Sequence, residues 1–282
     1  MVESWRLLDL GPVDGFTMTN LYEVVGKAVS LGSSPNTVIL NHPKSPFVNI
    51  GYHQIMEKEI NIEVVRKMGL DLIRRSIGGG AILDGPWEQD YFIIVNRRSH
   101  ECPATIPEFY SRFLKPTIGA LHCLGLEAEA AKLNDVTVGG KKISGNGAIT
   151  IDSANVLAGD ILINAPTDLM SKIINSPSEK FRDKLASSMS EWLTCLESEL
   201  GSAPMREEVK RSYLNAFSVE FGAELVTGSL TYEEQRGLDD LLVERKSPSW
   251  IFEKDEVFRR VLEEGARATK VKEGVSVCEA VF

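Results

Sequence analysis

The pattern of apolar and polar positions predicts a fold in which helices precede and follow a run of strands. Residues 17–32 place apolar side chains at helical spacing, with Thr19 or Asn20 as the N-terminal cap and Gly32 as the end of the helix. Other segments are predicted from their period and flanking proline or glycine: strands at 37–42, 47–53, 70–76 and 90–97, and helices at about 59–68, 167–175, 178–188, 204–219 and 231–244.

Two longer segments define the fold class. Residues 107–124 have a helical period that Pro116 should bend or divide. Residues 135–163 are typical of a β-meander, with a turn at Gly139 and Gly140 and a second turn near Asp152. Helices on both sides of a run of strands indicate an α+β fold with a mixed β-sheet core flanked by helices.

The length of 282 residues fits one large domain, alone or with a small appendage. The character of the chain changes after Trp250, where a charged helix is followed by an alternating segment that reaches the C-terminus as a strand. We therefore expect a boundary between 225 and 250. The expected division is a catalytic domain at 1–250 and an extension at 251–282.

The charge balance and the apolar runs exclude several classes of protein. A net charge of −9 and a pI near 5.1 argue against a surface that tracks nucleic acid. The N-terminus lacks the uninterrupted apolar core of a signal peptide, and no stretch approaches the roughly 18 apolar residues of a membrane helix. A cytoplasmic protein without a membrane partner is expected.

The cysteines and histidines do not form a metal-binding or disulfide pattern. The chain has Cys102, Cys123, Cys195 and Cys278, without a CxxC pair, and His42, His53, His100 and His122, without an HExxH pattern. This spacing fits reduced thiols, and no protein-built metal site is predicted.

The strongest candidate for chemistry is the sequence RRSIGGGAILDG at 74–85. Three glycines directly after a strand allow unusual backbone dihedrals and let a ligand approach the main chain. Exposed amides can hold a phosphate or carboxylate there, and Arg74 and Arg75 add guanidinium donors. The alternative is a tight turn beside two solvated arginines. Neither a Walker A nor a dinucleotide pattern is present.

The second candidate is LNDVTVGGKKISGNGA at 133–148. Lys141 and Lys142 occupy successive positions of a hairpin, so they should point to opposite faces and only one can face a pocket. A fixed lysine beside an activated acid can stabilise the charge that develops in the transition state. Asn134 and Asp135 are candidates for binding an amine, a ribose or a phosphate-bound metal, or they form only a turn.

Together these motifs resemble the lipoate-protein ligase and octanoyltransferase superfamily, which is related to biotin-protein ligases. The resemblance has order and spacing across residues 5–250. It comprises IGYHQ at 50–54, RRSIGGGA at 74–81, LNDV at 133–136, GKKISG at 140–145, a close match at 163–184 and a weaker match at 232–250.

The resemblance implies a two-step reaction and a set of site residues. A carboxylate attacks the α-phosphate of ATP to give lipoyl-AMP, and a lysine amine of a carrier domain then attacks the acyl carbon and releases AMP. Mg²⁺ would arrive with the nucleotide. Lys142 matches the family's essential lysine, and substrate or nucleotide binding is implied for Arg75, Gly78, Gly79, Gly80, Ala81, Asn134, Asp135, Ser144 and Gly145.

Two departures from the family pattern affect its partners and substrate. After the glycines the family usually has an aromatic-His-Asp stretch, whereas this chain has ILDGPWEQDYF, with Asp84 in the place of the histidine. Family ligases that act alone also carry an accessory domain, and 251–282 is too short to form one. We expect a separate accessory protein, with 251–282 as its docking element or as a remnant. The carrier partner is expected to be a dehydrogenase-complex acyltransferase subunit, the glycine-cleavage H-protein or a similar lipoyl-accepting domain.

Three rival functions remain. Octanoyltransferases of the superfamily take the acyl group from acyl carrier protein through a cysteine thioester without ATP. None of the four cysteines lies near Asn134 or between Lys142 and Glu191, which favours a ligase. A non-catalytic lipoate- or carrier-binding protein is favoured by the LDGPWEQDYF segment and opposed by Arg75, the glycines and Lys142. A biotin ligase is disfavoured because its basic glycine loop is absent.

Overall fold

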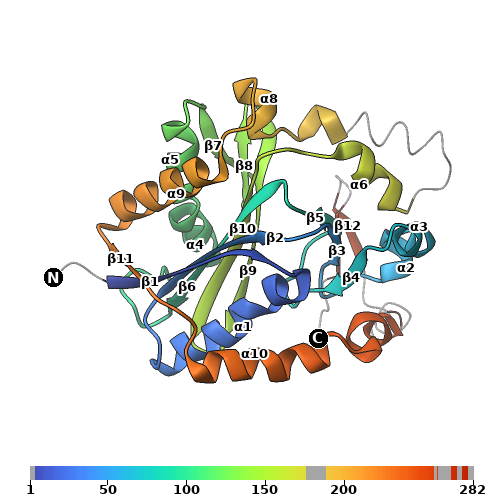
Figure 1. The fold of residues 1–282 in the computed structure, drawn as a ribbon, viewed down its shortest axis with the longest axis horizontal. Coiled ribbons are helices and arrows are strands. Elements are labelled where there is room, and N and C mark those ends of the chain that lie inside the picture. The colour runs from blue at the N-terminus through green and yellow to red at the C-terminus, as the bar shows by residue number, and fades with distance from the viewer. Residues whose placement is uncertain (1–3, 176–188, 257–258, 260–267, 272–274, 279–282) are drawn as a thin grey trace.

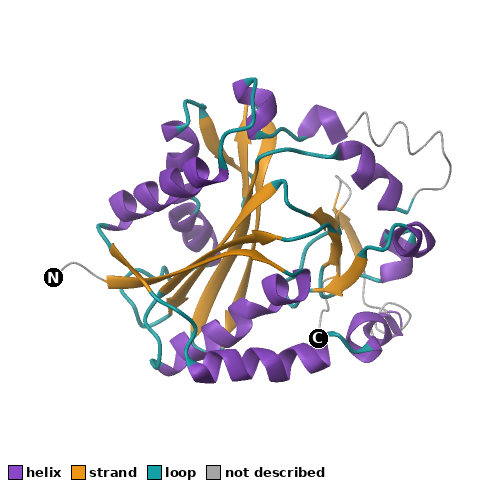
Figure 2. Cartoon of the chain, in the orientation of Figure 1, coloured by secondary structure: helices purple, strands orange, loops and turns teal. Residues whose placement is uncertain are grey.

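The computed structural model describes residues 4–175, 189–256, 259, 268–271 and 275–278. At its centre lies a mixed sheet, in which eight described strands have the order β11-β1-β2-β6-β10-β9-β8-β7 (Figures 1 and 2). Strand β1 is parallel to β2 and β11, and the pairs from β2 to β7 are antiparallel. The strands are β1 (Ser4–Val13), β2 (Thr37–Pro43), β6 (Glu88–Asn96), β7 (Ala128–Ala131), β8 (Asp135–Val138), β9 (Lys141–Ile151), β10 (Ala154–Leu162) and β11 (Glu224–Thr227).

Helices cover both faces of the large sheet, as predicted for a mixed sheet flanked by helices. Helices α1 (Gly15–Leu31) and α10 (Tyr232–Arg245) lie side by side on one face and bury their apolar side chains with those of β6 and β10. Helices α4 (Ile106–Phe113), α5 (Lys115–Cys123) and α9 (Arg206–Phe221) cover the other face, where Trp5 packs against Phe113 and Phe217. The molecule therefore has three layers.

A small sheet in the order β4-β3-β5 lies beside the large one (Figure 1). Its strands are β3 (Phe47–Ile50), β4 (Asp71–Arg74) and β5 (Ile82–Asp84). Around it lie α2 (Met56–Glu59), α3 (Ile62–Lys67), α6 (Thr167–Ile173) and the π-helix η1 (Ser249–Glu253), which share one apolar cluster with it. Helix α8 (Leu196–Leu200) and a hairpin of β12 (Ala268–Val271) and β13 (Val275–Cys278) complete the described elements.

The chain at the expected 250/251 boundary is in contact with the small sheet. The indole Nε1 of Trp250 donates to the Arg74 carbonyl at 2.8 Å. Arg74 is fully buried, and its guanidinium donates to the carbonyls of Ile251, Tyr52 and Gln54 and forms an ion pair with Asp255. Residues on both sides of position 250 are thus bound to the strand that leads into the glycine loop.

Most of the predicted elements are confirmed, with instructive differences. Helix 17–32 is α1, but it begins earlier because the carboxylate of Asp14, rather than Thr19 or Asn20, accepts the N–H of Thr17. The 107–124 segment is divided into α4 and α5, with Pro116 in the first turn of α5. The predicted C-terminal strand is a hairpin in the described part, and the predicted helix 178–188 lies outside the described residues. Among the described residues, no helix has the length and apolarity needed to cross a bilayer.

Candidate active site

The glycine loop connects β4 to β5 and lies against the end of β3. The amide of Arg75 donates to the Ile50 carbonyl and the amide of Tyr52 donates to the Ile77 carbonyl, which fixes both sides of the loop. Gly79 has a φ of +100°, a conformation that favours glycine. Gly78 and Gly79 are exposed, so their main chain is accessible to a ligand.

The Arg75 guanidinium folds back over this loop. It donates to the carbonyls of Gly80 at 2.8 Å and Gly78 at 3.0 Å, and to that of Asn49 at 3.3 Å. Arg75 therefore brings a positive charge to the loop and also holds the loop's shape. Ala81 follows, half-buried against the apolar cluster of the small sheet.

A β-bulge places Lys142 on the same face of the large sheet as the glycine loop. Strands β8 and β9 pair Val136 with Ser144 and Thr137 with Lys142, so Ile143 has no residue opposite it. Such an extra residue turns the following side chains to the other face. As a result Lys142 lies on the face of Gly145, where its Nζ is 2.8 Å from Asp135 Oδ1. Lys141 diverges, as expected, and donates to the Ser190 carbonyl.

The other predicted residues of the hairpin have mainly local contacts. Asn134 and Asn146 exchange side-chain-to-carbonyl hydrogen bonds across the hairpin, at 2.6 and 3.0 Å. The Ser144 hydroxyl is fully buried near Asn146 and Tyr91, on the face away from Lys142. The Gly145 amide donates to Asp160 at 2.5 Å. Only Lys142, Asp135 and Gly145 of this set face the glycine loop's side of the sheet.

Glycines in β9 bring the loop and the lysine together. A Cβ at Gly147 would lie 2.8 Å from Ile77, the residue before the glycines, and a Cβ at Gly145 would lie 2.8 Å from the Lys142 Nζ. Two strand positions span about 7 Å. The glycine loop and Lys142 are therefore neighbours on one face, as the sequence motifs alone could not show.

Four carboxyl groups that the sequence reasoning did not assign to the site lie on the same face. Strand register places Asp90 of β6 directly opposite Asp160 of β10, and Asp84 and Glu88 lie near them. Burial, opposed by a hydrogen bond from Asn49 and the charge of Arg75, raises the pKa of Asp84 to about 7. Burial and neighbouring carboxylates raise the pKa values of Glu88 and Asp90 well above their usual range, and burial raises that of Asp160.

Three cations oppose this negative charge from different elements. Arg75 acts on Asp84, Lys142 acts on Asp160, and Arg206 at the start of α9 acts on Asp90 and Glu88. Arg206 is held by the carbonyls of Pro86, at 2.5 Å, and Glu88. The sequence signalled Asp84 and Asp90 only as departures from the family pattern, and it gave no signal for Asp160 or Arg206.

The raised pKa of Asp84 predicts an unusual pH dependence of stability. An unfolded aspartate titrates near 3.9, whereas the folded group does so at about 7. The folded state therefore keeps a proton that the unfolded chain has released, and this group's stabilising contribution falls as the pH rises from about 4 through 7. We expect Asp84→Asn to flatten the fall in melting temperature between pH 5.5 and pH 8. An unchanged slope in the variant would contradict this assignment.

The close approach of β3 to the glycine loop predicts a sensitive position at Gly51. A Cβ there would lie 2.1 Å from the Gly79 carbonyl oxygen, so Gly51→Ala must displace the loop. We expect a loss of about 1–3 kcal/mol of stability, as for other overpacked sites. Gly78→Ala is the matched control, because its Cβ would meet no atom within 4 Å. Equal unfolding free energies of the two variants in urea would refute the contact.

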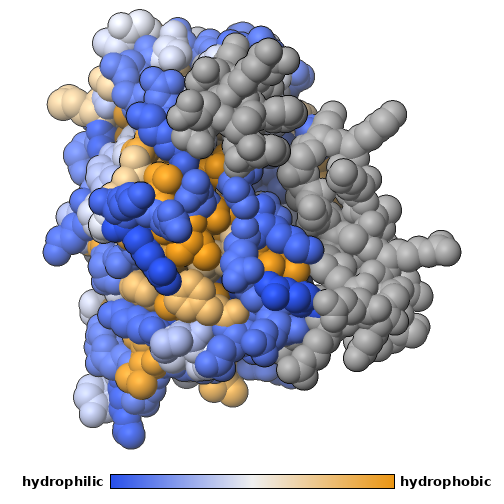
Figure 3. All heavy atoms as spheres, turned by 90° about the vertical axis from the view of Figure 1, so that its right-hand side faces the viewer, coloured by the Kyte–Doolittle hydropathy of each residue, from blue (hydrophilic) through white to orange (hydrophobic). Residues whose placement is uncertain are grey.

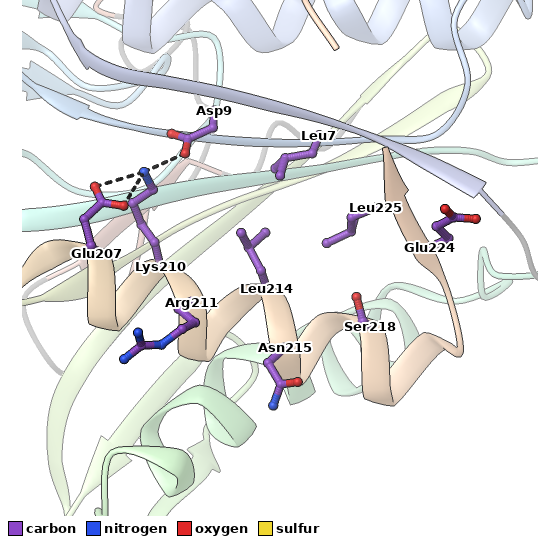
Figure 4. Close-up of a pocket in the computed structure, with 10 residues that line it drawn as sticks. All are labelled: Leu7, Asp9, Glu207, Lys210, Arg211, Leu214, Asn215, Ser218, Glu224 and Leu225. Atoms are coloured by element: carbon purple, nitrogen blue, oxygen red, sulfur yellow. Dashed lines mark hydrogen bonds and ion pairs between the residues drawn. The ribbon is translucent and has the colours of Figure 1, made fainter. Parts of the chain in front are cut away.

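A separate hollow of about 550 Å³ lies between β1, β11 and α9 (Figure 4). Its floor is apolar, with Leu7, Leu214 and Leu225, and Lys210 at one end contacts Asp9 at 2.5 Å and Glu207 at 3.2 Å. It lies on the α9 face of the sheet, away from Lys142. Figure 3 shows the right-hand side of Figure 1, where an apolar patch is framed by hydrophilic side chains.

Solved structures share this fold. A bipartite lipoate protein ligase of Thermoplasma acidophilum, described with its E2 lipoyl domain, matches with a TM-score of 0.79 at 24% identity, covering 88% of this chain and 96% of that one. A lipoate-protein ligase A bound with ATP matches with a TM-score of 0.74 at 20% identity, covering 89% of this chain and 98% of that one. At these identities the likeness shows the fold.

Sequence relatives carry two different names. Octanoyltransferase LipM of Moorella thermoacetica is 27% identical and covers 88% of this chain and 98% of its own length. Lipoate-protein ligase A subunit 1 of Thermoplasma acidophilum is 26% identical, covering 79% of this chain and 87% of its own. The family model for the lipoyl protein ligase A/B catalytic domain matches residues 14–218. The predicted resemblance is thus confirmed, and the chain belongs to the family of the lipoyl protein ligase A/B catalytic domain.

Proposed function

We propose that the chain activates lipoate with ATP to lipoyl-AMP and transfers the lipoyl group to a lysine of a carrier domain. The observation that carries the proposal is the placement of Lys142 beside an accessible glycine loop on one face of the sheet. Gly78 and Gly79 are exposed residues whose main chain would suit phosphate oxygens, and Lys142 supplies fixed positive charge. Mg²⁺ would enter with the nucleotide phosphates and reduce their negative charge.

The proposed roles follow from chemistry that needs positioning more than acid–base groups. Arg75 and the loop residues 78–81 would hold the nucleotide, and Lys142 would stabilise the oxygens of the carbonyl and phosphate as charge builds on them. Asp135 would orient the Lys142 ammonium, which it contacts at 2.8 Å. Asn134, Ser144 and Gly145 would act through the main chain of the hairpin, since their side-chain contacts are local or absent.

A second candidate is acyl transfer through a cysteine thioester without ATP. Relatives named octanoyltransferase favour it. A contact between residues far apart in the sequence also favours it. Leu193 forms a β-bridge with Lys142, and the Thr194 amide donates to the Lys142 carbonyl at 2.8 Å. Cys195 is next in sequence, with 3% of its surface exposed and its thiol 3.2 Å from the Ser198 hydroxyl. It therefore lies closer to Lys142 than its distance along the chain suggests.

One experiment separates these candidates. The purified chain is incubated with lipoate, Mg²⁺ and α-labelled ATP, and separately with octanoyl-acyl carrier protein and a lipoyl domain. Labelled lipoyl-AMP that is lost in Lys142→Ala supports the ligase. ATP-independent transfer that is lost in Cys195→Ala, and kept in a Cys102→Ala, Cys123→Ala double variant, supports the transferase. If neither product forms, the remaining candidate is a carrier- or lipoate-binding protein.

We further propose a catalytic domain at 1–250 and a partner-binding role for 251–282. The bipartite ligase among the structural neighbours supports a separate accessory protein. Full-rate formation of lipoyl-AMP by the isolated chain would argue against that partner.

A further inference from the structure

Polar groups without partners surround the buried carboxyl groups of the site. Asn41 of β2 is 1% exposed and directly opposite Asp90 in strand register, so the two side chains share one face. Within the described residues, neither amide atom of Asn41 has a hydrogen-bond partner, and the same is true of Asp90 Oδ2 and Asn49 Oδ1. Buried polar groups are almost always hydrogen-bonded, so these atoms point to a missing ligand.

The carboxyl groups of the site outnumber the cations near them. Asp84, Glu88, Asp90, Asp160 and Asp135 are opposed by Arg75, Lys142 and Arg206. Each of these cations already has partners. Arg75 donates to loop carbonyls, Lys142 pairs with Asp135, and Arg206 donates to the carbonyls of Pro86 and Glu88. Burial and mutual repulsion raise the pKa values of these carboxyl groups, and a bound cation would offset that repulsion, so the cluster favours a cation over a phosphate or carboxylate.

The unpartnered atoms indicate which cation fits. Three of the four are acceptors, namely Asn41 Oδ1, Asn49 Oδ1 and Asp90 Oδ2, and the fourth, Asn41 Nδ2, is a donor. A primary ammonium group has three donors and no acceptor, so it complements the three acceptors. In the described part of the chain, no three His, Cys, Asp or Glu side chains are placed to hold a metal ion. An organic ammonium is therefore the better match, and Mg²⁺ is retained as a competing outcome of the test.

We propose that the cluster of Asn41, Asn49, Asp84, Asp90 and Asp160 binds the primary ammonium group of a substrate beside Lys142. The inference rests on the proposed function for the location of the reacting acid. The ammonium comes either from the carrier lysine or from an amino group on the acid itself. In the first case a cluster carboxylate takes one proton from the lysine ammonium and the free amine attacks the acyl carbon. The acyl–phosphate bond breaks as the amide bond forms, and the second N–H proton passes to the phosphate of the departing AMP.

The site is tested by binding without ATP, so a failure of adenylation does not affect the result. Calorimetry compares n-butylammonium with n-butanol, which has the same shape without charge. We expect n-butylammonium alone to bind, and Asp90→Asn and Asp160→Asn each to weaken it at least tenfold. Glu129→Gln, an exposed carboxylate on β7, should leave it unchanged. The proposal would be overturned if n-butanol bound as tightly as n-butylammonium, or if neither probe bound. It would also be overturned if Mg²⁺ were the only cation that bound.

A competition experiment identifies the source of the ammonium. 8-Aminooctanoate that displaces octanoate and binds more tightly, with the gain lost in Asp90→Asn, assigns the amine to the acid. Nα-acetyl-lysine amide that binds together with octanoate, and is lost in the same variant, assigns it to the carrier lysine. Melting curves of both variants confirm folding, which should be preserved because burial already disfavours the charged forms of Asp90 and Asp160 and an amide has a similar shape. If both ligands bind Asp90→Asn and Asp160→Asn as tightly as they bind the wild type, the site is refuted.

Discussion

Lys142→Ala is expected to lower kcat/KM for formation of the activated acid by about 10²–10³-fold, the range found when one preorganised transition-state donor is removed. The melting temperature should change little, because Lys142 is half-buried and its ion pair with Asp135 is partly screened by solvent. The measurement is the initial rate with saturating ATP and varied acid, together with thermal unfolding of the same sample.

Lys141→Ala is the matched control for this prediction. It removes the same charge one position away, where the side chain contacts only the Ser190 carbonyl among the contacts described for it. We expect its activity to stay within about threefold of the wild type, because the exposed Lys141 side chain lies away from Lys142 and surface changes of this kind seldom alter stability by more than ~0.5 kcal/mol. Equal losses in the two variants would show that net charge, not the placement of Lys142, matters.

The second large effect is expected at Asp255, far from Lys142 in sequence. Asp255→Ala leaves the fully buried Arg74 guanidinium without its carboxylate partner. Breaking a buried pair in this way costs about 3–5 kcal/mol. For a protein of this size the melting temperature should fall by on the order of 10 °C. Because Arg74 leads directly into the glycine loop, the KM for ATP should rise as well.

Glu57→Ala is the comparison for that variant, since the Glu57–Arg259 pair is exposed on both sides. Exposed ion pairs contribute about 0–1 kcal/mol, so its melting temperature should barely move. If Asp255→Ala melts like Glu57→Ala, the pairing of Arg74 does not stabilise the fold. If it melts early but keeps the wild-type KM for ATP, the glycine loop does not depend on the segment after Trp250.

The sequence was informative where chemistry lies in one contiguous segment. The glycines at 78–80 and the Lys141–Lys142 pair are visible in single motifs, and their strand and hairpin contexts were predicted from period and turns. The carboxyl cluster was not predictable in this way. Asp90 and Asp160 meet only through the antiparallel register of β6 and β10, which depends on the whole sheet.

Two features of the structure depend on tertiary contacts that the sequence pattern does not show. The start of α1 was placed too late because Asp14 caps the helix before its apolar period begins. No cysteine lies between Lys142 and Glu191, as expected, but the bridge between Leu193 and Lys142 brings the residues that follow to the hairpin. Separation along the chain is a poor measure of distance once a strand returns to an existing sheet.

The two successive lysines make this hairpin tolerant of the loss of one residue. With the pairing of Val136 with Ser144 and the extra residue Ile143 both kept, deletion of Lys142 would bring Lys141 to the position opposite Thr137. Because the neighbouring residue is also a lysine, such a deletion would exchange one ammonium for another and need not remove the charge from the pocket. The two successive lysines thus make the hairpin tolerant of the in-frame deletion of one residue, which would otherwise inactivate it.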